Sequence, residues 1–146
     1  MKLNRKLLLV AGFIASLAGE AGAAGLYESK TTAAVPLPSA PGWTYVTSVY
    51  VPPGTWVVQA LSPAVNFGST DILRCMIWTN GTQQNAAAAM MGGDGGMPGA
   101  LGVQNLTVLS LPYGTSVYLY CGHDGAVAGQ RIDPGAALVV TRAPAN

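Results

Sequence analysis

The residues that could carry chemistry in this 146-residue chain are one histidine, two cysteines and a small set of carboxylates. The histidine, His123, is followed directly by Asp124 in the run CGHDG. A serine hydrolase needs a histidine base, an acid that orients the ring and a serine within hydrogen-bond distance. Two adjacent residues beside glycine suit a turn better than an oriented dyad, and the chain has no G-x-S-x-G elbow. We therefore predict that the protein is not an enzyme, with a hydrolase as the remote alternative.

The aspartates of the chain stand beside turn residues. In that position an aspartate side chain bonds nearby backbone N–H groups, which explains its presence without any ligand. The alternatives are a calcium site, which needs several convergent oxygen ligands, or a pair of glycosidase carboxylates. An open zinc site would need more than one histidine and two cysteines that face the core. We expect no metal and no cofactor; the aspartates concerned are Asp71, Asp94, Asp124 and Asp133.

Two apolar runs, residues 72–78 and 116–121, each alternate around one cysteine. Side chains on a strand alternate between the two faces of its sheet, so Cys75 and Cys121 each lie in an apolar row. Two strands with inward cysteines, in a chain that carries an export signal, predict one disulfide between core strands. The expected inward rows are Leu73, Cys75 and Ile77 on the first strand and Val117, Leu119 and Cys121 on the second.

The row opposite the cysteines is aromatic, whereas a solvated sheet face should carry Thr, Ser and Lys. Aromatic rings with an arginine among them are the usual anchors of a protein interface, and sugar rings also stack on such rings. The competing interpretation is that the lead-in of the chain or a methionine-bearing loop covers this row. The candidate binding or interface residues are Arg74, Met76, Trp78, Tyr118 and Tyr120, with Met90, Met91 and Met97 of the loop.

Residues 1–23 have the three-part layout of a secretory signal peptide. A positively charged start at residues 1–6 is followed by an uncharged apolar run at 7–19 and by the small-residue pattern AGA. The apolar run is short for the ~30 Å of a bilayer core, so an uncleaved membrane anchor is the less favoured alternative. We expect cleavage near Ala23 and a secreted, extracellular or periplasmic protein that has no membrane attachment after cleavage.

The mature chain carries few charges. Three of the seven cationic residues and one of the six acidic residues lie in residues 1–23, which leaves four positive and five negative side chains. A soluble domain usually has about a quarter charged residues, so the surface is unusually neutral. This balance gives no electrostatic footprint for nucleic acid or an anionic membrane, and we expect neither as a partner. It favours a homo-oligomer or another buried interface; the alternative is a surface hydrated by Ser, Thr, Asn, Gln and Gly.

Strand signals separated by turn signals run through the rest of the chain, without helical periodicity. Residues 24–41 are rich in proline and predict an extended lead-in or at most an edge strand. Residues 42–146 are the expected β-sandwich domain, in which PPG at 52–54 joins the first two strands into a hairpin. The fold class is all-β, an antiparallel β-sandwich or small barrel. The expected strands are 43–51, 55–61, 72–78, 103–111, 116–121 and 137–142, with a short one at 130–132.

Residues 83–100 are expected to form a loop and to be the most mobile part of the domain. The pair Asn80-Gly81 just before them is the strongest short turn signal of the chain. Four consecutive alanines follow and predict at most one helical turn, because the next residues are a glycine cluster with Pro98 that ends any helix. Glycine leaves the backbone many conformations to lose on folding, which favours mobility.

The order VPPGTWVVQA, LRCMIW, LSLPYGTSVYLYCG and IDPGAALVVTR resembles a class of small secreted bacterial β-sandwich domains of jelly-roll type. In that class a hairpin with proline and glycine precedes one cysteine strand, a second cysteine strand follows, and a terminal strand closes the domain. The resemblance covers about residues 49–142, and its outline is similar to the trimeric TNF- and C1q-like jelly rolls. It implies a jelly-roll-like sandwich of uncharacterised function and no activity.

Taken together, these patterns favour a secreted, non-catalytic structural or adhesive surface protein that acts by self-assembly. The alternative is a module that binds carbohydrate or another cell-surface ligand through the aromatic row. Oligomer size and glycan retention would separate these two functions.

Overall fold

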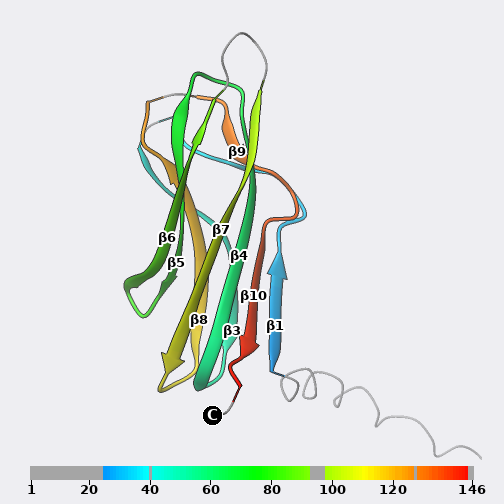
Figure 1. The fold of residues 1–146 in the computed structure, drawn as a ribbon, viewed down its shortest axis with the longest axis vertical. Coiled ribbons are helices and arrows are strands. Elements are labelled where there is room, and N and C mark those ends of the chain that lie inside the picture. Colours follow the sequence, from blue (N-terminus) through cyan, green and yellow to red (C-terminus); the bar gives the residue numbers. More distant parts are fainter. Residues whose placement is uncertain (1–24, 40, 93–97, 127, 145–146) are drawn as a thin grey trace, which may run out of the picture.

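The protein is a sandwich of two antiparallel β-sheets (Figure 1). The computed structural model describes residues 25–39, 41–92, 98–126 and 128–144. Among these residues no helix is long and apolar enough to cross a membrane. The strands are β1 (Leu26–Lys30), β2 (Val35–Pro36), β3 (Gly42–Val51), β4 (Gly54–Asn66), β5 (Asp71–Thr79), β6 (Thr82–Met91), β7 (Gly99–Leu111), β8 (Thr115–His123), β9 (Gln130–Ile132) and β10 (Ala137–Arg142).

The first sheet, which we call sheet A, is arranged around the 13-residue strand β4. On one side β4 pairs along its whole length with β7, from Gly54 opposite Leu111 to Asn66 opposite Gly99. On its other side β4 pairs first with β10 and then with β9. The long β4 is therefore the central strand of sheet A, whereas β1 and β2 join the sheet through β10 and β9.

Two strands of sheet A come from the expected lead-in at residues 24–41. β1 pairs with β10 at the edge of the sheet, and β2 pairs with β9. Proline cannot donate a ladder hydrogen bond, so Pro36 is tolerated because β2 also lies at an edge. The expected signal peptide, residues 1–23, lies outside the described residues.

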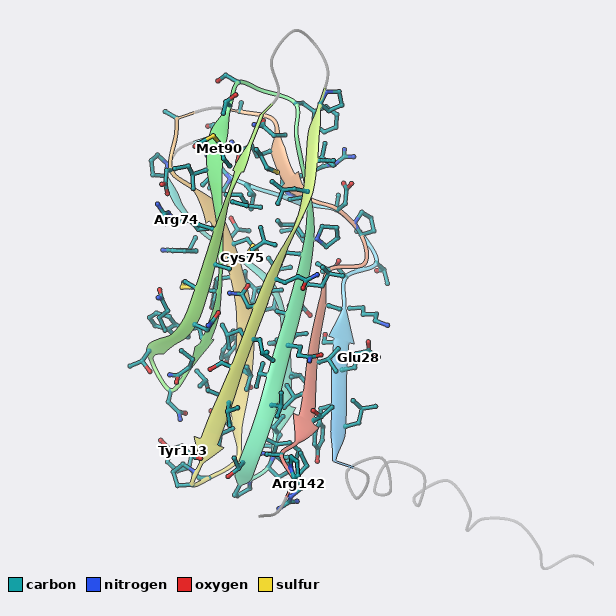
Figure 2. All side chains as sticks on the ribbon, in the orientation of Figure 1. Glu28, Arg74, Cys75, Met90, Tyr113 and Arg142 are labelled. Atoms are coloured by element: carbon teal, nitrogen blue, oxygen red, sulfur yellow. A yellow bond between two sulfur atoms is a disulfide. The ribbon has the colours of Figure 1, made fainter. Side chains whose placement is uncertain are left out.

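The second sheet, which we call sheet B, has the strand order β3-β8-β5-β6. β8 and β5 are its two central strands, and Cys75 on β5 lies directly opposite Cys121 on β8. The two cysteines form a disulfide, which confirms the predicted pairing. Figure 2 shows Cys75 between the sheets, whereas the neighbouring Arg74 lies on the outside.

The expected hairpin across PPG at 52–54 is wrong. β3 pairs with β8 in sheet B, whereas β4 pairs with β7 and β10 in sheet A, so the turn carries the chain from one sheet to the other. Trp56 explains the crossing: its side chain is fully buried, and its indole N–H donates a 3.0 Å hydrogen bond to the carbonyl of Pro52. Gly54 supplies the backbone angle, with φ of 147°. Because Trp56 enters the core directly after the turn, residues 52–54 connect the two sheets instead of two neighbouring strands of one sheet.

The expectation of a loop over residues 83–100 is also wrong for much of its length. Asn80 and Gly81, with φ of 51° and 75°, make the predicted tight turn, and the chain returns as β6 along β5. Alanine has low strand propensity, so the alanine run gives no local strand signal. The strand forms because β5 supplies a ladder and because Ala87 and Ala89 pack against the core.

The core fills the space between the two sheets. The inward rows of the two cysteine strands are as expected, since Leu73, Cys75 and Ile77 have no exposed surface. The same holds for Val117, Leu119 and Cys121. Sheet A contributes Trp56, Val58, Leu138 and Val140 from the other side. The structure thus confirms an antiparallel, jelly-roll-like β-sandwich with a disulfide in its core.

Candidate functional site

The outer face of sheet B carries the aromatic side chains predicted from the sequence and three further aromatic side chains from β3. Arg74 and Trp78 alternate with the buried row of β5, and Tyr118 and Tyr120 do the same on β8. Met76 occupies the position between Arg74 and Trp78 but is only 5% exposed, so it is covered by its neighbours. The register places Met76 opposite Tyr120 and Trp78 opposite Tyr118. We call this surface the aromatic face; it comprises Trp43, Tyr45, Tyr50, Arg74, Met76, Trp78, Tyr118 and Tyr120.

Three of these residues come from β3 and were not expected there. Tyr45 pairs with Tyr120, but the register then shifts, so that Ser48 pairs with Tyr118. This bulge reverses the alternation of β3, because an extra residue in one strand moves all later side chains to the other face. Both Tyr45 and Tyr50 therefore point outward, although they are five positions apart. No local sequence signal marks this bulge, and the outward position of Tyr50 follows from the pairing with β8.

The aromatic face is open to solvent along β3 and better packed along β8 and β5. Trp43, Tyr45 and Tyr50 are 48%, 50% and 63% exposed, respectively. The rings of Tyr45, Tyr118 and Tyr120 form a triangle with centroid separations between 6.1 and 6.5 Å. Such contacts hold the rings in place before any partner arrives, so little side-chain freedom remains to be lost on binding.

At the Trp43 end of the aromatic face lies a small hollow of about 150 Å³. Its floor is Gly122, where a side chain is excluded because a Cβ atom would lie 2.0 Å from the carbonyl oxygen of Gly42. The indole of Trp43 forms one wall, and the ion pair of Arg74 with Asp124 forms another. An aromatic plane beside a guanidinium and a carboxylate is an arrangement that can stack a ring and bond its hydroxyl groups.

The Arg74–Asp124 pair is bidentate. Nε of Arg74 donates to Oδ1 of Asp124 at 2.7 Å, and Nη2 donates to Oδ2 at 2.6 Å. The hydrogen bonds from Arg74 lower the pKa of Asp124, and the same contacts raise the pKa of Arg74. Both side chains are about 40% exposed, so they stay ionised and reachable at neutral pH.

The side chain of His123 forms a hydrogen bond with Asp71 and not with Asp124, its neighbour in the sequence. Nδ1 of His123 lies 2.8 Å from Oδ2 of Asp71, and Nε2 contacts the carbonyl oxygen of Pro38. The two contacts hold the ring of His123 from opposite sides. The amide of Gln130 also donates to Asp71, at 2.8 Å. The cluster ties β5, β8 and β9 to the segment that leads into β3.

This cluster is unsuited to hydrolysis. The side chain of His123 has no exposed surface, and the nitrogen that would act as a base is occupied by Pro38. A general base must reach the proton of a nucleophile, and here neither ring nitrogen is free to do so. Burial raises the pKa of Asp71, but hydrogen bonds from Ile72, Gln130, His123 and Gly125 outweigh it and lower the pKa overall. We interpret the cluster as a structural clamp.

Met90 and Met91, two of the candidate methionines, lie in different environments. Met90 projects outward from β6 and is 71% exposed, whereas Met91 is 1% exposed and belongs to the core. Met97 lies outside the described residues. Among the residues that the structure describes, no group of three or more His, Cys, Asp or Glu side chains could hold a metal ion.

No family model and no curated protein matches this chain. Among solved structures, it is similar to infectious bursal virus-derived T=1 particles, with a TM-score of 0.50 and 14% identity over 80% of this chain and 31% of that one. The VP2 subviral particle of infectious bursal disease virus has a TM-score of 0.47 and 15% identity over 80% and 32%. The Gt strain of that virus has a TM-score of 0.49 and 16% identity over the same shares. The chain thus spans about a third of these neighbours, and the likeness concerns the fold alone.

Proposed function

We propose that this protein is a secreted, non-catalytic structural protein that self-associates through the aromatic face. The observation that carries the proposal is the half-exposed row of Trp43, Tyr45 and Tyr50 beside the packed tyrosines of β8. Each large aromatic side chain buries ~150–250 Å² when it is fully covered, so a row of them is costly to leave in water. Monomeric proteins rarely expose a contiguous apolar surface of this kind.

The distribution of charge supports the same proposal. Glu28 pairs with Lys30, Arg74 with Asp124 and Arg131 with Asp133, all at 2.6–2.7 Å. Arg142 lies over the ring of Trp56. Charges that are paired within one molecule exert little repulsion on the next, so two copies can approach without an electrostatic penalty. The fold is compatible with such a role, because a chain that shares it is found in infectious bursal virus particles.

The test is the mass of the mature protein, residues 24–146, measured by light scattering across a range of concentrations. We expect an oligomer, and we expect the double variant Tyr45→Thr/Tyr120→Thr to have a smaller mass at an unchanged circular dichroism spectrum. Threonine keeps strand propensity while it removes the rings. Tyr113→Thr is the matched control, because Tyr113 is 59% exposed in the turn between β7 and β8, outside the aromatic face. A monomeric wild type, or a double variant of wild-type mass, would contradict the proposal.

A second candidate function, glycan binding, is favoured by the hollow beside Trp43. A sugar ring stacked on the indole would place its hydroxyl groups within reach of Arg74 and Asp124. The test is retention on immobilised polysaccharides. Trp43→Ala should lose retention while the mass stays that of the wild type, and Tyr113→Ala serves as the control. Equal retention of the Trp43→Ala variant and the wild type would exclude this hollow as the site.

A further inference from the structure

The outer face of sheet A also exposes apolar side chains, but these are aliphatic instead of aromatic. Leu61 on β4 is 43% exposed, and Leu106 and Val108 on β7 are 61% and 62% exposed. Leu26 on β1 is 52% exposed. A sheet that packs on the core with one face should carry polar residues on the other. We call this surface the aliphatic face.

The pairing of β4 with its two neighbours brings these side chains together. Val57 lies opposite Val108, and Gln59 lies between Leu106 on β7 and Val139 on β10. Gln59, Leu106 and Val139, together with Leu61 and Gln104, line a shallow groove of about 580 Å³. Val57 and Val108 extend the apolar surface beside it. The groove is mainly apolar, and its exposed hydrogen-bonding side chains are the amides of Gln59 and Gln104. Asn105 also lines it, but its side chain is buried and donates to the carbonyl of Cys75.

The size of the aliphatic face approaches that of one side of a standard dimer interface. β4 and β7 are 13 residues long, and β10 and β1 add 6 and 5 residues beside them. With ~3.4 Å per residue and ~4.8 Å between strands, the face covers on the order of 600 Å². A standard protein interface buries about 800 Å² per partner.

The chemistry of the face fits a second copy of itself. An amide side chain both donates and accepts, so Gln59 and Gln104 of one copy can bond those of another across a two-fold axis. Leucine and valine also pack well on leucine and valine. The charged residues at the rim, Glu28 with Lys30 and Arg131 with Asp133, are already paired within the chain. Figure 2 shows Glu28 on β1, at the edge of this sheet.

We infer that the aliphatic face is a second self-association interface, at which the same face of another copy packs about a two-fold axis. The inference rests on the proposed function, in which the aromatic face joins two copies on the opposite side of the sandwich. One dimer cannot satisfy both faces, because they lie on opposite sides of the molecule. The assembly is therefore open-ended, and it grows by alternating aromatic and aliphatic contacts.

Variants of each face, examined by sedimentation velocity on the mature protein, test the inference. Leu106→Thr/Val108→Thr removes the aliphatic contact, and Tyr45→Thr/Tyr120→Thr removes the aromatic one. The wild type should form species larger than a dimer that grow with concentration. Each double variant should stop at the dimer, and the quadruple variant should be a monomer. Ser110→Thr, on the same face of β7, is the control that should sediment like the wild type.

The outcomes separate the two proposals. If the aliphatic variant keeps the wild-type size distribution while the aromatic variant shrinks, the second interface is overturned and the proposed function stands. A wild type that forms a dimer and nothing larger would likewise overturn the second interface and leave the proposed function standing. A monomer from the aliphatic variant alone would overturn the two-fold arrangement, because it indicates contact between unlike faces. A monomeric wild type would overturn both proposals. If the aliphatic variant unfolds, Leu61→Thr on β4 tests the same groove.

Discussion

The inner and outer faces of sheet B are built by the same four strands, yet they have different neighbours. Along β5 the inner row of Leu73, Cys75 and Ile77 is fully buried, while Arg74 between them is exposed. The inner row packs against sheet A, and the outer row carries the aromatic face. Under the proposed function, stability and association therefore depend on alternate residues of one strand. Substitutions on the inner face should change the free energy of unfolding, and those on the outer face should change oligomer size.

The largest effect on stability is expected from removal of the disulfide. It joins residues 46 positions apart, for which loop-closure entropy gives about 4 kcal/mol. Cys75→Ala/Cys121→Ala should lower the free energy of unfolding by up to this amount in urea titrations, while the folded fraction keeps its oligomer size. An unchanged urea midpoint would show that the inner face does not depend on the disulfide.

The next largest effect on stability is expected from Asp71, the first residue of β5. Its side chain is 7% exposed and accepts hydrogen bonds from His123 and Gln130. Asp71→Asn replaces a carboxylate oxygen that accepts these hydrogen bonds by an amide nitrogen that cannot accept them, and an unsatisfied buried polar group costs about 1–3 kcal/mol. Urea unfolding at neutral pH measures this loss. A loss as small as that of an exposed carboxylate would mean that the clamp contributes little.

Acid should weaken the same clamp. The pKa of Asp71 is lowered below 3.8 in the folded protein, so the unfolded chain takes up its proton at higher pH than the folded chain does. The contribution of Asp71 to stability is therefore present above about pH 3.8 and is lost as the pH falls through the lower folded value. Thermal unfolding as a function of pH should show a shallower acid loss in Asp71→Asn than in the wild type. Equal acid loss in both proteins would assign it to other groups.

On the outer face, the double variant Tyr118→Ser/Tyr120→Ser should change stability less and association more. The two rings contact each other and Tyr45, and such aromatic contacts contribute about 1 kcal/mol. We expect a smaller particle with intact folding in light scattering and calorimetry. Lost glycan retention at unchanged size would instead favour the second candidate function. A lower melting temperature alone would mean that this part of the face is structural.

The smallest effect is expected from Arg74→Gln. Both partners of the Arg74–Asp124 pair are exposed, and surface ion pairs contribute little to stability. The melting temperature should therefore stay that of the wild type. The pKa of Asp124 should rise toward its ordinary value, because the hydrogen bonds from Arg74 that lower it are gone. NMR titration of Asp124 measures this change, and an unshifted titration would show that the pair does not persist in solution.

Local patterns were sufficient for the inward rows and for the tight turn at Asn80-Gly81. They failed where a neighbour supplied the reason for a structure. β6 contains an alanine run of low strand propensity, and it forms because its backbone pairs with the neighbouring strand β5. The crossing at Gly54 is a turn by its residues, but the burial of Trp56 decides that it joins two sheets.

The candidate site was likewise predictable from the sequence only in part. Alternation around Cys75 and Cys121 was enough to place Arg74, Met76, Trp78, Tyr118 and Tyr120 on one side, because side-chain direction is a property of a single strand. Which strands lie side by side is decided by contacts between segments far apart in sequence. The pairing of β3 with β8, and the bulge in it, brought Tyr45 and Tyr50 onto the aromatic face. The partnership of His123 with Asp71, 52 residues away, arose likewise from the meeting of β8 and β5.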